Sequence, residues 1–153
     1  PWQFIRGTAN LFGLKVNSWV DERKDPEAST IAAARYLKHL HGLFNSWPLA
    51  LASYNIGPGH FNAARALAKL QGADPNAWYE MKQILPLLAR PKYYERVKSG
   101  RARGGEAVLL VENIRAYYDI LVRNQPAYVP VSQRMEGMIG IQGGSGAGLK
   151  LKR

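Results

Sequence analysis

Apolar residues recur at helical spacing over most of the first 123 residues. The clearest stretch follows Asp25-Pro26-Glu27, where an Asp N-cap, a Pro at the first position and an acid in the first turn predict a helix start. Beyond it, six apolar side chains share one helix face: Ala33, Tyr36, Leu37, Leu40, Leu43 and Phe44. The pattern predicts a long amphipathic helix that ends near Asn45-Ser46.

Four further helices are expected after this break. They are a short apolar helix over 49–54, an amphipathic helix from about 60 to 70, a helix that Asp74-Pro75 starts and that runs through Met81, and a helix from about 106 to 122. The last carries an apolar face of Ala107, Val111, Ile114, Tyr118 and Leu121. Because no alternation of apolar and polar residues is long enough for a strand, the predicted fold class is all-α.

The composition changes after Arg123. A Gly-rich stretch covers 137–148, and the chain ends in Lys150-Leu151-Lys152-Arg153. We expect one helical domain over residues 1–123, which is long enough to bury a core, and a flexible, basic, Gly-rich tail over 124–153.

The charge balance favours anionic partners. The chain has 21 Lys and Arg against 11 Asp and Glu, a formal net charge of +10. Six of the cations crowd one segment, opposed only by Glu95: Arg90, Lys92, Arg96, Lys98, Arg101 and Arg103. This segment is either a solvated helix face and loop or a surface for an anion.

Two absences narrow the classes of protein further. No cysteine is present, which excludes disulfides and thiolate metal sites. No apolar run approaches the roughly 20 residues that a membrane-spanning helix needs. The opening Pro1-Trp2 has neither Met nor a polar lead-in, so an export signal is expected upstream of it.

The residues that could carry chemistry gather in one segment, 52–59, which reads Ala-Ser-Tyr-Asn-Ile-Gly-Pro-Gly. It places the phenol of Tyr54 and the amide of Asn55 at a helix end, before glycines that permit close approach to the backbone. Taken alone, the segment is more typical of a helix C-cap with Tyr54 in the core. His39 and His41, two apart on a helix, cannot share a metal, and a surface role is expected for the histidines.

Four ordered matches give the chain a resemblance to family 1 lytic transglycosylases, of the soluble lytic transglycosylase type with a lysozyme-like fold. Segment 52–59 resembles the family's Ala-x-Tyr-Asn-x-Gly-x-Gly motif, and Trp2-Gln3-Phe4-Ile5 with Thr8-Ala9 resembles its Gly-Leu-Met-Gln motif. The connection over 21–37 and the order of motifs over 64–115 are also similar. The resemblance spans residues 1 to about 123, and four motifs in order are far more specific than any one.

The resemblance implies cleavage of the β-1,4 bond between N-acetylmuramic acid and N-acetylglucosamine in peptidoglycan, leaving 1,6-anhydro ends. Family members use one glutamate as acid and then base, whereas ordinary glycosidases use two carboxylates. One suffices because the attacking 6-hydroxyl is tethered to the sugar. That glutamate precedes the Gly-Leu-Met-Gln motif, so it is expected upstream of Pro1, and residues 1–153 alone are expected to be inactive. No metal or cofactor is implied.

The resemblance also assigns substrate-binding residues. Gln3 would line the cleft near the scissile bond, Tyr54 would reach towards the catalytic carboxyl, and Asn55 would hydrogen-bond an acetamido sugar. Glu106 is a weaker candidate, because an acid near this point lines the family's cleft but also suits a helix start. At Leu110 many family members carry a Tyr, and Arg6 stands where Pro is common.

The sequence leaves two other functions open. A non-catalytic peptidoglycan-binding module would keep the cleft without the chemistry. A basic helical nucleic-acid binder would use the cations of 90–103, but no basic recognition helix or stacking strand is apparent, so nucleic acid is not expected as a partner. The expected partners are glycan strands, together with an anionic membrane surface or other envelope proteins, in the periplasm or cell envelope.

Overall fold

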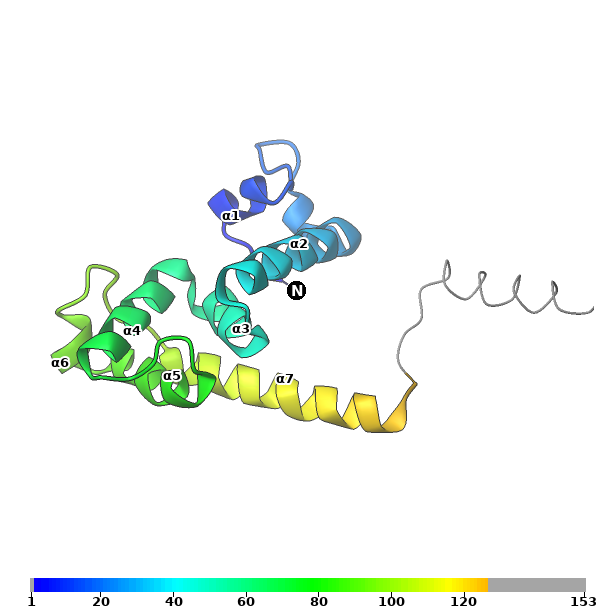
Figure 1. The fold of residues 1–153 in the computed structure, drawn as a ribbon. Helices are drawn as coiled ribbons and strands as arrows, with labels where there is room; N and C mark the ends of the chain where they lie inside the picture. The colour runs from blue at the N-terminus through cyan, green and yellow to red at the C-terminus, as the bar shows by residue number, and fades with distance from the viewer. Residues whose placement is uncertain (1, 127–153) are drawn as a thin grey trace, which may run out of the picture. The chain divides into compact units, whose positions relative to one another are not determined.

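The computed structural model describes residues 2–126, and over these the chain is helical (Figure 1). The elements in chain order are α1 (Arg6–Leu11), η1 (Glu22–Lys24), α2 (Pro26–Phe44), α3 (Trp47–Ile56), α4 (Pro58–Leu70), α5 (Trp78–Ile84), η2 (Leu85–Ala89), α6 (Pro91–Tyr94) and α7 (Gly104–Asn124). An isolated bridge between Val16 and Asp21 is the extended pairing found in this part of the chain. The all-α prediction is confirmed.

The chain divides into a first unit, residues 1–115, and a second that begins at Ala116, with α7 running from one into the other. Residues 127–153 lie outside the described part, and so does most of the predicted Gly-rich tail. The domain boundary at residue 123 stays a prediction. None of the helices described is both long and apolar enough to cross a membrane.

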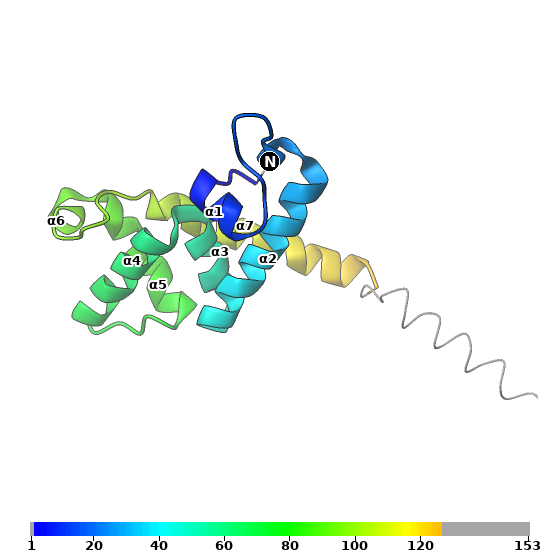
Figure 2. The ribbon, with the colours of Figure 1, turned by 90° about the horizontal axis from the view of Figure 1, so that it is seen from above.

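Helix α3 is the centre of the first unit. Its sequence is apolar almost all round, which is typical of a helix buried on several sides. Figures 1 and 2 show it between α1 and α2 on one side and α4 and α5 on the other. Leu49 and Ala52 pack into a core cluster with α4, α5, η2 and α7, whereas Ala50 joins a second cluster with α2 and residues 4–14. Packing on both sides therefore fixes the position of α3, including its C-terminal end at Ile56.

Local signals set both ends of α2 and the break between α3 and α4. The Asp25 carboxylate accepts a hydrogen bond from the Ala28 amide at 2.9 Å, as the N-cap prediction required, and α2 ends at Asn45 in a left-handed conformation. Gly57, with a φ of 84°, separates α3 from α4.

The predicted start of one helix was wrong. The helix expected to start at Asp74-Pro75 begins only at Trp78, because the Asn76 amide donates a hydrogen bond to the Asp74 carboxylate at 2.8 Å and closes a turn there. On α7, Tyr118 and Leu121 of the predicted apolar face are 67% and 54% exposed. The periodicity identified an apolar stripe, but the described residues of the second unit contain only the end of this helix, so the stripe has no partner within that unit.

Candidate glycan-binding groove

Residues 2–5 and the end of α3 form the walls of one groove. Gln3, Tyr54 and Asn55 together line a hollow of about 430 Å³, and the same three line an adjoining hollow of about 290 Å³. The larger one shares Thr8, Tyr36 and Pro58 with a third hollow of about 400 Å³, so the groove continues along α2 and α4. These volumes suit a ligand of several rings.

Gln3 has an unusual backbone conformation at the edge of this groove. Its φ is 50°, in the left-handed region that non-glycine residues rarely adopt. Hydrogen bonds hold the residues on both sides of it: the Tyr54 hydroxyl donates to the Trp2 carbonyl at 2.9 Å, and Arg23 donates to the Phe4 carbonyl at 3.3 Å. A strained residue that its neighbours fix in place is typical of a functional site.

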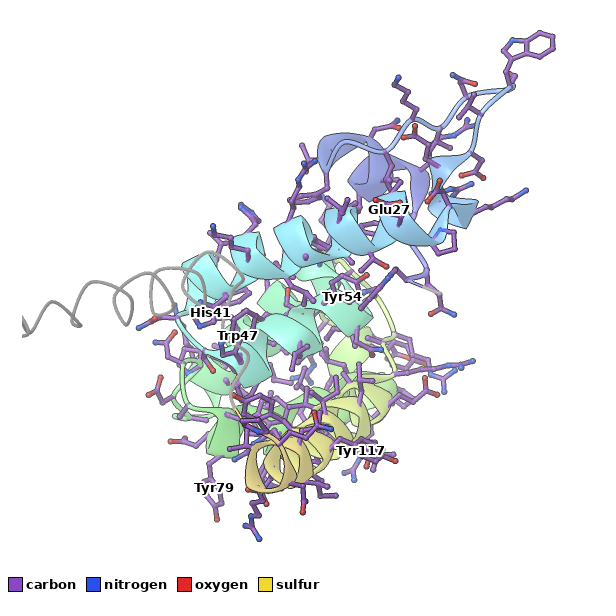
Figure 3. The ribbon with its side chains drawn as sticks, turned by 90° about the vertical axis from the view of Figure 1, so that its right-hand side faces the viewer. Glu27, His41, Trp47, Tyr54, Tyr79 and Tyr117 are labelled. Carbon is purple, nitrogen blue, oxygen red and sulfur yellow. The ribbon has the colours of Figure 1, made fainter. Side chains whose placement is uncertain are left out.

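Trp2 is fixed through its ring as well. The indole N–H donates to the Thr30 hydroxyl of α2 at 2.8 Å, and the ring meets Tyr54 edge-on with 6.5 Å between centroids. Tyr54 also packs against Phe4 and Tyr36, with centroids 6.3 and 5.2 Å away. This aromatic cluster sets the position of the groove wall, and Figure 3 shows Tyr54 between α2 and α3.

The Tyr54 phenol is half-buried, and burial raises its pKa above the ordinary value, with the neighbouring Tyr36 adding to the shift. Burial likewise raises the pKa of Tyr36. Both phenols are therefore neutral near pH 7. The Tyr54 hydroxyl donates its only proton to the Trp2 carbonyl, so its oxygen can only accept a hydrogen bond from a ligand.

The chemistry of the groove suits an uncharged, hydroxyl-rich ligand. The larger hollow is lined by aromatic and amide side chains, and its described lining contains no Asp, Glu, Lys or Arg. Aromatic faces cover the C–H faces of sugars, while amides reach hydroxyl and acetamido groups. No carboxyl group that could act as the general acid on a glycosidic bond stands among these residues.

Glu106 lies elsewhere. Its side chain is 64% exposed in the first turn of α7 and pairs with Arg103 at 3.4 Å, and it is not among the residues that line the groove. Leu110 does line the smaller hollow beside Gln3. A binding role for Glu106 stays a prediction.

Sequence reasoning missed His60 and Tyr36 as groove residues. His60 was expected at the surface, but it is half-buried, lines the larger hollow, and has its Nδ1 3.1 Å from the Ile56 carbonyl. Its position directly after the Gly57-Pro58-Gly59 turn was the available signal. Over residues 2–126 no group of three or more His, Asp or Glu side chains could hold a metal ion.

Residues 2–76 match the family described as "Transglycosylase SLT domain". The chain belongs to this family. The helical architecture of residues 2–126, a range in which no strand occurs, is the lysozyme-like fold of the SLT domain, as predicted.

Curated relatives extend the similarity over nearly the whole SLT chain. A "Membrane-bound lytic murein transglycosylase F" of Marinobacter nauticus is 40% identical over 151 residues, covering 94% of this chain and 29% of the relative. The protein of that name from Thiobacillus denitrificans is 40% identical, covering 90% and 31%, and that from Shewanella loihica is 50% identical, covering 67% and 23%. The chain spans less than a third of the length of these relatives.

The strain at Gln3 gives a first prediction. Gln3→Gly removes the cost of a left-handed L-residue, so the free energy of unfolding should stay level or rise by up to about 1 kcal/mol. Binding of a soluble glycan should nevertheless weaken about fivefold, the equivalent of one hydrogen bond. Chemical denaturation and calorimetric titration measure the two effects.

Asn45→Gly is the matched control, because Asn45 has a φ of 47° and caps α2 but does not line the groove. It should affect stability similarly and leave glycan binding unchanged. Equal weakening of binding in both variants would show that the Gln3 side chain makes no contact with the ligand.

The loop that supports Phe4 gives a second prediction. Arg23 donates to both carboxylate oxygens of Asp21, at 2.8 and 2.7 Å, and these hydrogen bonds lower the Asp21 pKa to about 2. Because this pKa lies below the unfolded value, the pair stabilises the fold above about pH 4 and the stabilisation is lost as pH falls through about 2. NMR titration should find the low pKa in the wild type and a value near 3.8 in Arg23→Gln; an ordinary pKa in both would contradict the ion pair.

Proposed function

We propose that this SLT domain binds the glycan strands of peptidoglycan in the groove between Trp2-Gln3 and Tyr54-Asn55, as part of a lytic transglycosylase. The observation that carries the proposal is the meeting of Gln3, Tyr54 and Asn55 around the same two hollows. These three come from the two motifs that resemble the family most closely, and the relatives are named as lytic murein transglycosylases. The aromatic and amide lining of the two hollows around Gln3 contains no Asp, Glu, Lys or Arg, which supports a neutral sugar as the ligand.

The proposed reaction breaks the β-1,4 bond between N-acetylmuramic acid and N-acetylglucosamine. A carboxylic acid gives its proton to the leaving O4 as the bond from C1 to O4 breaks. The same carboxylate then takes the proton of the muramoyl 6-hydroxyl as O6 bonds to C1, and no water is consumed. The groove contributes by positioning the sugar. When it holds the muramoyl ring in the reactive geometry, the 6-hydroxyl attacks within the same molecule and no second reactant has to be bound.

We propose that the acid is a glutamate supplied from ahead of Pro1. This is consistent with the groove lining described above, in which the described residues place no carboxyl group. The same observation favours the second candidate, a peptidoglycan-binding module without catalysis. For either function we place the protein in the periplasm or cell envelope, in keeping with relatives named as membrane-bound.

Product analysis distinguishes these functions. The chain extended upstream of Pro1, as its gene encodes it, is incubated with purified peptidoglycan, and the products are examined by mass spectrometry. Anhydro ends, one water lighter than reducing ends, are expected from the extended chain and none from residues 1–153. Reducing ends would identify a hydrolase instead, and binding without release from either chain would identify the binding module.

A further inference from the structure

A separate hollow adjoins the groove behind the Gly57-Pro58-Gly59 turn. It has a volume of about 510 Å³ and is lined by Gly59, Ala63 and Ala66 of α4 and by Val97, Lys98 and Ser99 of the segment between α6 and α7. Gly59 also lines the larger hollow of the groove, so this residue borders both spaces. A branch of a ligand bound in the groove would pass Gly59 to enter the side hollow.

The floor of this side hollow is apolar and its edge is cationic. Ala63, Ala66 and Val97 offer methyl groups, whereas the Lys98 side chain is exposed. The Ser99 hydroxyl is buried and has no hydrogen-bond partner among the described residues. A buried hydroxyl without a partner is costly, and a ligand oxygen would satisfy it.

The surroundings reinforce the charge of Lys98. The other cations of residues 90–103 are also exposed, and the ion pair found among the described residues of this segment joins Arg103 to Glu106. A field of this sign attracts carboxylates. The peptides that branch from muramic acid in peptidoglycan combine the methyl groups of alanine with free carboxylates, so they match both the floor and the edge.

We infer that the side hollow formed by α4 and residues 97–99 binds the stem peptide of peptidoglycan, with Lys98 pairing with a peptide carboxylate and the alanine side chains of α4 contacting its methyl groups. This inference rests on the proposed function, because the peptide reaches the hollow from a glycan strand in the groove. It makes the domain selective for strands that still carry peptides.

The test compares two forms of the same glycan strands, with stem peptides and after their removal by an amidase. Binding of both to the full-length gene product is measured for the wild type, Lys98→Gln and Ala66→Leu, which fills the hollow without changing charge. Both variants should lower the preference for peptide-bearing strands by about two- to fivefold, the range of an exposed ion pair, and leave peptide-free strands unaffected.

Lys92→Gln is the matched control, because Lys92 is an exposed lysine of the same segment that does not line the hollow. An equal loss in Lys92→Gln and Lys98→Gln would overturn the inference in favour of general attraction by the basic surface. If Lys92→Gln and Lys98→Gln equally weaken binding to vesicles of anionic phospholipid and neither changes binding to either form of glycan, the basic surface binds membranes and the inference is overturned. If the wild type binds neither form of strand, the proposed function itself fails.

Discussion

Replacing Tyr54 with phenylalanine should reduce cleavage of peptidoglycan by about 10- to 100-fold in the catalytically competent chain, while the protein stays folded. The substitution keeps the ring in its aromatic cluster but removes the hydrogen bond to the Trp2 carbonyl, 2.9 Å long. Loss of one such bond costs only about 1 kcal/mol of stability. The effect on rate is larger, because a displacement near 1 Å in a positioning residue can lower a rate about 100-fold.

The physical reason is that Tyr54 and Arg23 donate hydrogen bonds to the backbone carbonyls of the residues before and after Gln3. These bonds hold Gln3 at a left-handed φ of 50°. Without the Tyr54 bond, Gln3 can relax out of the groove. Release of soluble muropeptides from purified peptidoglycan measures the rate, and thermal denaturation measures stability.

Tyr79→Phe is the control, since Tyr79 is 75% exposed and lies well apart from Tyr54 in Figure 3. Its rate should equal that of the wild type. An unchanged rate in Tyr54→Phe would show that the hydroxyl neither positions the groove nor touches the substrate.

Gly104→Ala should strongly destabilise the first unit. A Cβ on Gly104 would lie 1.9 Å from the Leu85 carbonyl oxygen and 2.4 Å from its carbon, both backbone atoms of η2. Relieving that overlap requires α7 and η2 to separate, in a core that includes Leu85, Ala107 and Val111. We expect a loss of at least about 3 kcal/mol, the upper part of the range for overpacking.

The adjacent residue provides the control. A Cβ on Gly105 would meet nothing within 4 Å, so Gly105→Ala should leave stability unchanged or raise it by up to about 1 kcal/mol. Urea denaturation of both variants makes the comparison. Equal stabilities would mean that the start of α7 does not pack on η2 as described.

The parts of the fold that short-range signals encode were predictable from the sequence. The Asp25 cap and the adjacent Pro26 predicted the start of α2, and the Gly57 break separated α3 from α4, because capping and glycine conformations act within a few residues. The start of α5 was misplaced because Asp74-Pro75 fits a turn as well as a helix start.

Features that depend on contacts between distant residues could not be predicted from spacing. Nothing around Gly104 indicates Leu85 as its neighbour, and the left-handed Gln3 depends on partners in η1 and α3. For the candidate site, motif resemblance predicted that Gln3, Tyr54 and Asn55 belong to one site. The position of His60 in the same groove could be seen only from the path of the chain at the start of α4.

The most direct test of the glycan-binding groove is an NMR titration of ¹⁵N-labelled residues 1–153 with a soluble, peptide-free glycan strand. The side-chain amides of Gln3 and Asn55 and the indole N–H of Trp2 give separate signals, and all three residues line both hollows. We expect these three signals to shift together with a single affinity. Shifts confined to residues outside the groove, or no shift at millimolar glycan, would contradict the account.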